Sequence, residues 1–169
     1  MPQGLKATSS VVAIGFSTDE TVANTFTESS VDLNLSPLDR EVFVVLAINM
    51  DPFYPEAVAA TDTSVSASLS TTSATRVLNL SFPNCLAAAV NSIKAGGFLD
   101  GGVGFQTRLE TPPANLDYIG IIATNDFYVQ VQGDGNTTVK GVDGKLYGYR
   151  ARADADIYAA LVQSEALSA

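Results

Sequence analysis

The chain has 169 residues, of which 46% are hydrophobic and 16% are charged, and its formal net charge is −9. This length suffices for one domain with a buried core, and the composition excludes a disordered chain. Nucleic-acid affinity comes largely from Lys and Arg that neutralise phosphates, so an acidic chain is not expected to bind a genome directly.

Strand patterns dominate the first half of the chain. Residues 11–16 form a β-like run, and residues 31–35 alternate apolar and polar side chains, as a half-buried strand does. Residues 42–50 are β-branched and almost continuously apolar, which predicts a central strand. Residues 63–71 alternate apolar side chains with Ser, so this strand has a polar face that either water or a neighbouring molecule covers.

A short strand at residues 76–82 and a helix at residues 83–95 are expected next. Pro83 suits an early helical position, apolar side chains follow at helical spacing, and Gly96 and Gly97 provide a stop.

The last third of the chain reads as further strands and a final helix. Asp143-Gly144 lies within the clearest hairpin signal, because Asp-Gly supplies the positive φ angles of a tight turn. A short C-terminal helix is expected at residues 156–164. The strands are expected at residues 103–109, 118–123, 127–132 and 146–153.

These elements favour a single mostly β domain over residues 1–169. About eight strands without βαβ alternation predict an antiparallel β-sandwich, jelly-roll-like, with one short inserted helix and a short C-terminal helix. No segment has the apolar length of a transmembrane helix, and the N-terminal apolar run is too short for a signal-peptide core.

The chain contains no histidine, and Cys85 is its only cysteine. These counts exclude Ser-His-Asp and Cys-His triads, nearly all zinc sites and an intrachain disulfide. Cys85 lies in an apolar stretch, where a buried and inert thiol is expected. We therefore expect no enzyme activity and no cofactor.

Paired carboxylates are the remaining catalytic option, since a glycosidase needs only two. Asp51 and Glu56 flank the aromatic pair Phe53-Tyr54, but a turn whose aromatic side chains pack on a neighbour is the favoured interpretation. Oxygen-rich segments at residues 133–136 and 154–156 lack the spacing of a calcium loop and are interpreted as turns.

Arg150, Arg152 and Asp154 share one face of the last predicted strand, opposite a face that carries Tyr147 and Tyr149. If the tyrosines face inward, the charged side chains face out, as a solvated edge of mixed charge or as a row of ion pairs between subunits. The candidate subunit interface therefore consists of Arg150, Arg152, Asp154, Phe53 and Tyr54.

Several stretches resemble the capsid proteins of tailless icosahedral viruses: residues 39–45, 61–65, 118–124, 136–138 and 149–154. The size, strand number and Ser/Thr/Gly/Ala-rich texture of the chain are also similar to a single-jelly-roll virion protein. The resemblance implies self-assembly into a symmetric shell with copies of itself and other capsid proteins, no catalytic residues, and a location in the virion after synthesis in the host cytoplasm. Many such proteins begin with a basic arm, whereas this chain begins Met-Pro-Gln-Gly-Leu-Lys, so genome contact would fall to another component.

Two other functions remain open at this stage. One is a ligand-binding β-sandwich module that recognises a carbohydrate or a protein surface, for which Phe53-Tyr54 is the plausible aromatic patch, although the chain has no Trp. The other is a carboxylate-dependent glycoside hydrolase, which ranks last because the chain is small and no acid pair is recognisable.

Overall fold

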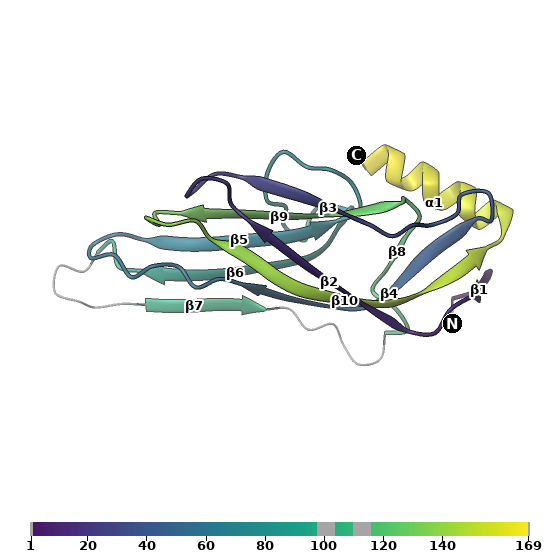
Figure 1. The fold of residues 1–169 in the computed structure, drawn as a ribbon, viewed down its shortest axis with the longest axis horizontal. Coiled ribbons are helices and arrows are strands. Elements are labelled where there is room, and N and C mark those ends of the chain that lie inside the picture. Colours follow the sequence, from purple (N-terminus) through teal and green to yellow (C-terminus); the bar gives the residue numbers. More distant parts are fainter. Residues whose placement is uncertain (1, 98–103, 110–115, 169) are drawn as a thin grey trace.

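In the computed structural model, which describes residues 2–97, 104–109 and 116–168, two antiparallel sheets face each other and one helix follows the last strand (Figure 1). Sheet A contains β1 (Leu5–Ala7), β2 (Val12–Asp19), β4 (Glu41–Pro52), β8 (Gly120–Ile122) and β10 (Gly141–Ala153). Sheet B contains β3 (Thr27–Asp32), β5 (Thr63–Ser70), β6 (Cys85–Lys94), β7 (Gly104–Leu109) and β9 (Asp126–Asp134). The helix α1 spans Ala155–Ser168. The predicted mostly β, sandwich-like fold with a C-terminal helix is confirmed.

The two sheets have different strand orders. In sheet A, β10 lies between β4 and an edge formed by β2 and β1, and β8 pairs with the other side of β4. In sheet B the order is β3-β9-β5-β6-β7. Both chain ends lie at the same end of the sandwich, where β1 and α1 are found (Figure 1).

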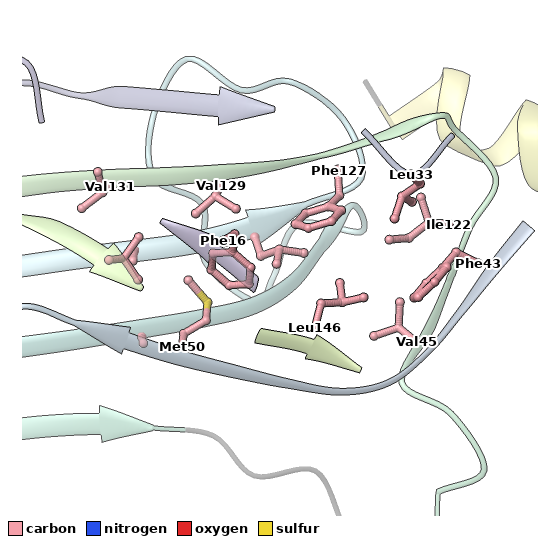
Figure 2. Packing of buried hydrophobic residues seen from close by; sticks show 14 of the residues in the cluster. Phe16, Leu33, Phe43, Val45, Met50, Ile122, Phe127, Val129, Val131 and Leu146 are labelled. Carbon is pink, nitrogen blue, oxygen red and sulfur yellow. The ribbon is translucent and has the colours of Figure 1, made fainter. Parts of the chain in front are cut away.

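The main core fills the space between the sheets (Figure 2). Phe16 from β2 meets Phe127 from β9 edge to face, with ring centroids 6.0 Å apart. Phe43 and Leu146 are also fully buried. A second apolar cluster lies on the opposite face of sheet A, where Ile157, Tyr158 and Leu161 of α1 pack on it. Sheet A is thus covered on both faces at the end of the molecule where α1 lies.

The long apolar run of β4 contains a β-bulge that keeps its side chains in phase with the core. Gly148 pairs with Val45 while its neighbour Tyr147 pairs with Ala47, so Leu46 has no partner on β10. Because strand side chains alternate between faces, this extra residue lets both Val45 and Ile48 face the inner core. The predicted strand at residues 42–50 is confirmed, and its continuous apolar start reflects burial on both faces, with Phe43 and Val45 in the main core and Val42 and Val44 in the cluster under α1.

The predicted inserted helix at residues 83–95 is wrong. Cys85–Lys94 forms β6, which pairs with β5 and β7. Ala87 and Ala89 pack against the inner core, where β5 presents the larger Leu69. Small side chains are needed at these positions, and pairing on both sides of the strand outweighs the helix propensity of alanine.

The predicted hairpin at Asp143-Gly144 is also wrong, since both residues lie inside the continuous strand β10. A Cβ atom at Gly144 would lie 2.5 Å from Cζ of Phe16, and one at Gly148 would collide with the ring of Phe43. Both glycines make room for aromatic rings of the core, and neither marks a turn.

The predicted strand at residues 76–82 does not form, and residues 71–84 are a loop. This loop covers the serine face of β5: Leu78 N–H donates to Ser68 Oγ (3.0 Å), and Ser68 Oγ donates to Oε1 of Gln130 (2.7 Å). Gln130 and Ser68 are fully buried. The Ser68 end of the polar face of β5 therefore meets a loop of the same chain, whereas Ser64 and Ser66 remain half-buried.

The remaining predicted strands, other than that at residues 31–35, correspond to β2, β5, β7, β8, β9 and the second half of β10, with ends shifted by a few residues. The strand predicted at residues 31–35 is wrong in its bounds, because β3 ends at Asp32 and residues 33–35 follow it as a loop. Residue 103, placed in a strand by the sequence, lies outside the described residues. The short strand β1 was not predicted. Among the described residues, no helix is long and apolar enough to cross a bilayer.

Candidate functional site

The candidate interface residues lie at opposite ends of sheet A. β4 and β10 are antiparallel, so Glu41 pairs with Arg152 at one end and Pro52 pairs with Val142 at the other. The 12-residue β4 separates these ends by about 36 Å at the usual rise per residue. One contact surface does not include both groups, so we treat them as two sites.

Arg150 is held inside its own chain. Its guanidinium donates to the carbonyl oxygens of Leu33 (2.7 Å) and Asn34 (2.9 Å) and forms an ion pair with Glu41 (3.3 Å). The expectation that the tyrosines face inward is wrong. Arg150 pairs with Phe43 and lies on the inter-sheet side, whereas Tyr149 packs in the cluster under α1. Arg150 on β10 therefore links Leu33 and Asn34, which follow β3, to Glu41 at the start of β4.

Arg152 and Asp154 are more exposed. Arg152 makes a surface ion pair with Asp39 at 3.5 Å, and such a pair contributes little to stability. Asp154 precedes α1, and its carbonyl oxygen accepts the first helical hydrogen bond from Tyr158 N–H at 2.9 Å. An Asp at this position favours helix initiation. A role of either residue in subunit contacts stays a prediction.

An exposed aromatic pair lies at the other end of sheet A. The rings of Tyr54 and Phe105 have centroids 5.6 Å apart, and these residues are 67% and 53% exposed. Phe53 is 40% exposed. The sequence placed Phe105 on the regular apolar face of a strand and gave no signal that it would meet Tyr54. The pair joins the loop after β4 to the edge strand β7.

The carboxylates Asp51 and Glu56 do not form a catalytic pair. The two oxygens of Glu56 accept hydrogen bonds from the backbone N–H groups of Thr137 (3.0 Å) and Thr138 (2.9 Å), and from both hydroxyls. These bonds, those from the hydroxyls first, lower the pKa of Glu56 to about 2. Such a group anchors a loop and is unsuited to donating a proton near neutral pH.

Other polar groups singled out in the sequence also have structural partners. Asn136 Oδ1 accepts from Glu56 N–H (3.0 Å), and its amide nitrogen donates to Ser64 O (3.0 Å). Cys85 is buried, and this burial raises the pKa of its thiol. Within the described ranges, no three His, Cys, Asp or Glu side chains gather as they would around a metal ion.

An open depression of about 610 Å³ lies on the face of sheet A that is turned away from sheet B, beyond the end that α1 covers. It is formed where β2, β10 and β4 run side by side. Asp143 is flanked by Ser17 on one side and by Asp51 on the other, and Lys145 is flanked by Gly15 and Asn49. The residues lining the depression are Gly15, Phe16, Ser17, Asn49, Asp51, Asp143, Gly144, Lys145 and Tyr147.

No protein-family model, curated protein or solved structure matches the chain. The geometry of the chain itself therefore carries the functional interpretation.

The described surface offers two kinds of contact. The Tyr54–Phe105 pair presents apolar area of the type that protein interfaces bury. The open depression presents hydrogen-bond donors and acceptors on a rigid three-strand platform. Both arrangements are therefore candidate contact surfaces.

Proposed function

We propose that the chain is a structural subunit of a virus capsid, built on a jelly roll, which associates with copies of itself and with other capsid proteins. The observation that carries the proposal is the strand order. Eight strands, counted without β1 and β7, pair in a nested way: β2 with β10, β3 with β9, β4 with β8 and β5 with β6. This first-with-last nesting is the pattern expected of the double Greek key in jelly rolls, a fold common among capsid proteins.

Fold alone does not select a function, because jelly rolls also occur in ligand-binding proteins. The surface supports a structural role. Single exposed apolar side chains are common on monomers and decide nothing; the most exposed here are Val11, Val22, Leu38, Tyr54, Phe105, Leu116 and Leu167. Tyr54 and Phe105 differ because their exposed rings lie together and form a joint apolar surface.

The distribution of contacts favours a head-to-tail arrangement of subunits. The Tyr54–Phe105 pair lies at one end of β4, and the exposed ion pair of Arg152 with Asp39 lies at the other. Two different surfaces on one subunit form heterologous contacts, which close into rings when the rotation between subunits allows it. We place the aromatic pair at the centre of one such contact, because aromatic side chains dominate interface energetics.

The net charge of −9 supports a subunit that contacts other proteins rather than the genome. Location in the virion is part of the same proposal.

Assembly of the purified chain tests this function. Light scattering across salt and protein concentration, with negative-stain imaging of large species, is expected to reveal rings, capsomer-sized oligomers or shells. The double variant Tyr54→Ser/Phe105→Ser is expected to stay monomeric, whereas Tyr118→Ser, which alters an exposed aromatic residue outside the pair, is expected to assemble normally. A wild-type protein that is monomeric under all these conditions contradicts the proposal.

A further inference from the structure

The open depression on sheet A exists because Gly15 places no side chain on its base. A Cβ atom added at Gly15 would meet only the carbonyl oxygen of Gly144, at 4.0 Å, so the space above Gly15 is empty. Gly144 turns its missing side chain toward Phe16 in the core, and its backbone lies next to Gly15. The backbone of two neighbouring strands therefore forms the base of the depression, and polar side chains from three strands surround it.

Asp51 on β4 and Asp143 on β10 are directly paired residues, so their side chains project from the same face of sheet A. Like charges at directly opposite positions destabilise a sheet, so this pairing does not contribute to the stability of sheet A. Ser17 Oγ donates to Oδ1 of Asp143 at 2.6 Å, which fixes that carboxylate and leaves its second oxygen available. Two adjacent carboxylates can together accept several hydrogen bonds from one ligand.

Donors and an aromatic side chain complete the site. Lys145 follows Asp143 on the same face of β10, and Asn49, which pairs with Lys145, offers an amide that both donates and accepts. Tyr147 lies one position further along this face and is half-buried. The set combines acceptors at one end, donors in the middle and an aromatic side chain at the other end.

These groups discriminate among ligand classes. The paired carboxylates repel phosphates and nucleic acids, and the predominantly polar side chains around the base do not favour a lipid. Lys145 offsets one of the two carboxylate charges and leaves a net charge of −1 at the depression, so a small cation is the main competing class of ligand. Neutral hydroxyl groups both donate and accept hydrogen bonds and therefore match all of these side chains. The depression has a volume of about 610 Å³ and is open to solvent, so it can contact one face of a small ligand rather than enclose it.

We propose that the open depression on β2, β10 and β4 binds a neutral saccharide, with the carboxylates of Asp51 and Asp143 accepting from its hydroxyl groups and Lys145 and Asn49 donating to them. The proposal does not rest on self-assembly, since the lining residues come from a single chain.

Saturation-transfer difference NMR tests the proposal, because it detects weak ligands of both monomers and large assemblies. The probes are neutral di- and trisaccharides of glucose, galactose, mannose and N-acetylglucosamine. Sialyllactose serves as an anionic probe, and 1,4-diaminobutane and calcium chloride are added as competitors. At least one neutral saccharide is expected to bind, sialyllactose is expected to bind more weakly, and neither cation is expected to displace the neutral ligand.

Gly15→Val is the most informative variant. It places three carbon atoms over the base of the depression without removing a polar group, and the open space above Gly15 lets the strand keep its conformation. Saccharide binding is expected to be lost while the melting temperature is retained. Ala13→Val adds similar bulk to the same face of β2 outside the lining, and its affinity is expected to stay within about twofold of wild type. Asp143→Asn is expected to weaken binding by about tenfold or more, because hydrogen bonds to a charged acceptor are strong.

Three results would overturn the proposal. One is the absence of binding by every neutral saccharide up to its solubility limit. Another is saccharide binding that survives Gly15→Val in a folded protein, which would place the ligand elsewhere. The third is displacement of the saccharide by calcium or the diamine, which would make the depression a cation site.

Discussion

The two halves of the outer face of sheet A differ, although the same strands β4 and β10 build both. In the covered half, Val44 and Ala151 are buried in the cluster under α1. In the open half, Asp51 and Lys145 occupy the corresponding outward positions and face the depression. The boundary lies at the bulge between Tyr147 and Gly148.

The length of α1 explains why the covered half ends where it does. A helix of 14 residues is about 21 Å long, whereas the 13 residues of β10 extend over about 40 Å. A helix that follows β10 directly therefore covers only part of the sheet. Apolar side chains occur where the helix reaches and polar side chains where it does not, so the depression is a surface that the fold leaves uncovered.

The largest effect is expected from removing a helix contact in the covered half. Leu161→Ala deletes a side chain that packs on the cluster around Val44, which costs about 2 kcal/mol for a partly buried leucine. Helical signal and amide protection of α1 are expected to fall in circular dichroism and hydrogen exchange, while the strands keep theirs. Val162→Ala, which changes an exposed neighbour on the same helix, is the control. Equal losses in both variants would show that α1 does not depend on this contact.

A smaller effect is expected at Glu165, which ties α1 to the end of β8. Its Oε1 accepts from Ala123 N–H at 3.0 Å, but its buried Oε2 accepts no hydrogen bond from the part of the chain that the structure describes. The neighbouring Thr124 hydroxyl is engaged with the carbonyl oxygens of Thr71 and Asp126. Burial raises the pKa of Glu165, so the protonated form is favoured when α1 is docked.

A carboxyl group with a raised folded-state pKa contributes stability at low pH that is lost as the pH rises through that pKa. Wild-type α1 is therefore expected to be better protected below pH 4.5, the ordinary pKa of a glutamate, than at neutral pH. Glu165→Gln keeps the acceptor for Ala123 N–H and removes the charge, so it is expected to stabilise the helix at about pH 7 by about 1 kcal/mol and to flatten the pH dependence. A variant whose helix protection varies with pH as in wild type would contradict this role.

Local patterns in the sequence predicted the strands of the core well. A strand that packs one face against a second sheet has apolar and polar side chains at alternating positions, and this alternation is visible in the sequence. Local patterns failed where long-range contacts decide the structure. The glycine at position 144 accommodates the ring of Phe16, a residue 128 positions away, and this cannot be distinguished locally from a turn glycine. Ala87 and Ala89 favour a helix in isolation and form a strand because both pair with β5, and Ala89 also pairs with β7.

The depression was not predictable for the same reason. Asp51 was paired with the nearby Glu56, whereas its actual neighbour across the sheet is Asp143, 92 positions along the chain. Strand register is fixed by the packing of the whole sandwich, so the sequence contained the residues of the site but not their arrangement.

The smallest effect is expected in the open half, where the facing carboxylates of Asp51 and Asp143 repel each other. Asp51→Asn removes this repulsion and is expected to raise the free energy of unfolding by about 0.5 kcal/mol in low salt, with the gain shrinking as salt screens the charges. Urea titrations at low and high ionic strength measure both. Asp134→Asn is the control, because Asp134 is exposed and pairs with Ser64 on β5. A gain in Asp51→Asn together with weaker saccharide binding would mean that the open half retains an unfavourable charge pair because it binds a ligand. Equal stability in both variants would mean that the carboxylates point apart, and the depression would lose the acceptor pair on which saccharide recognition depends.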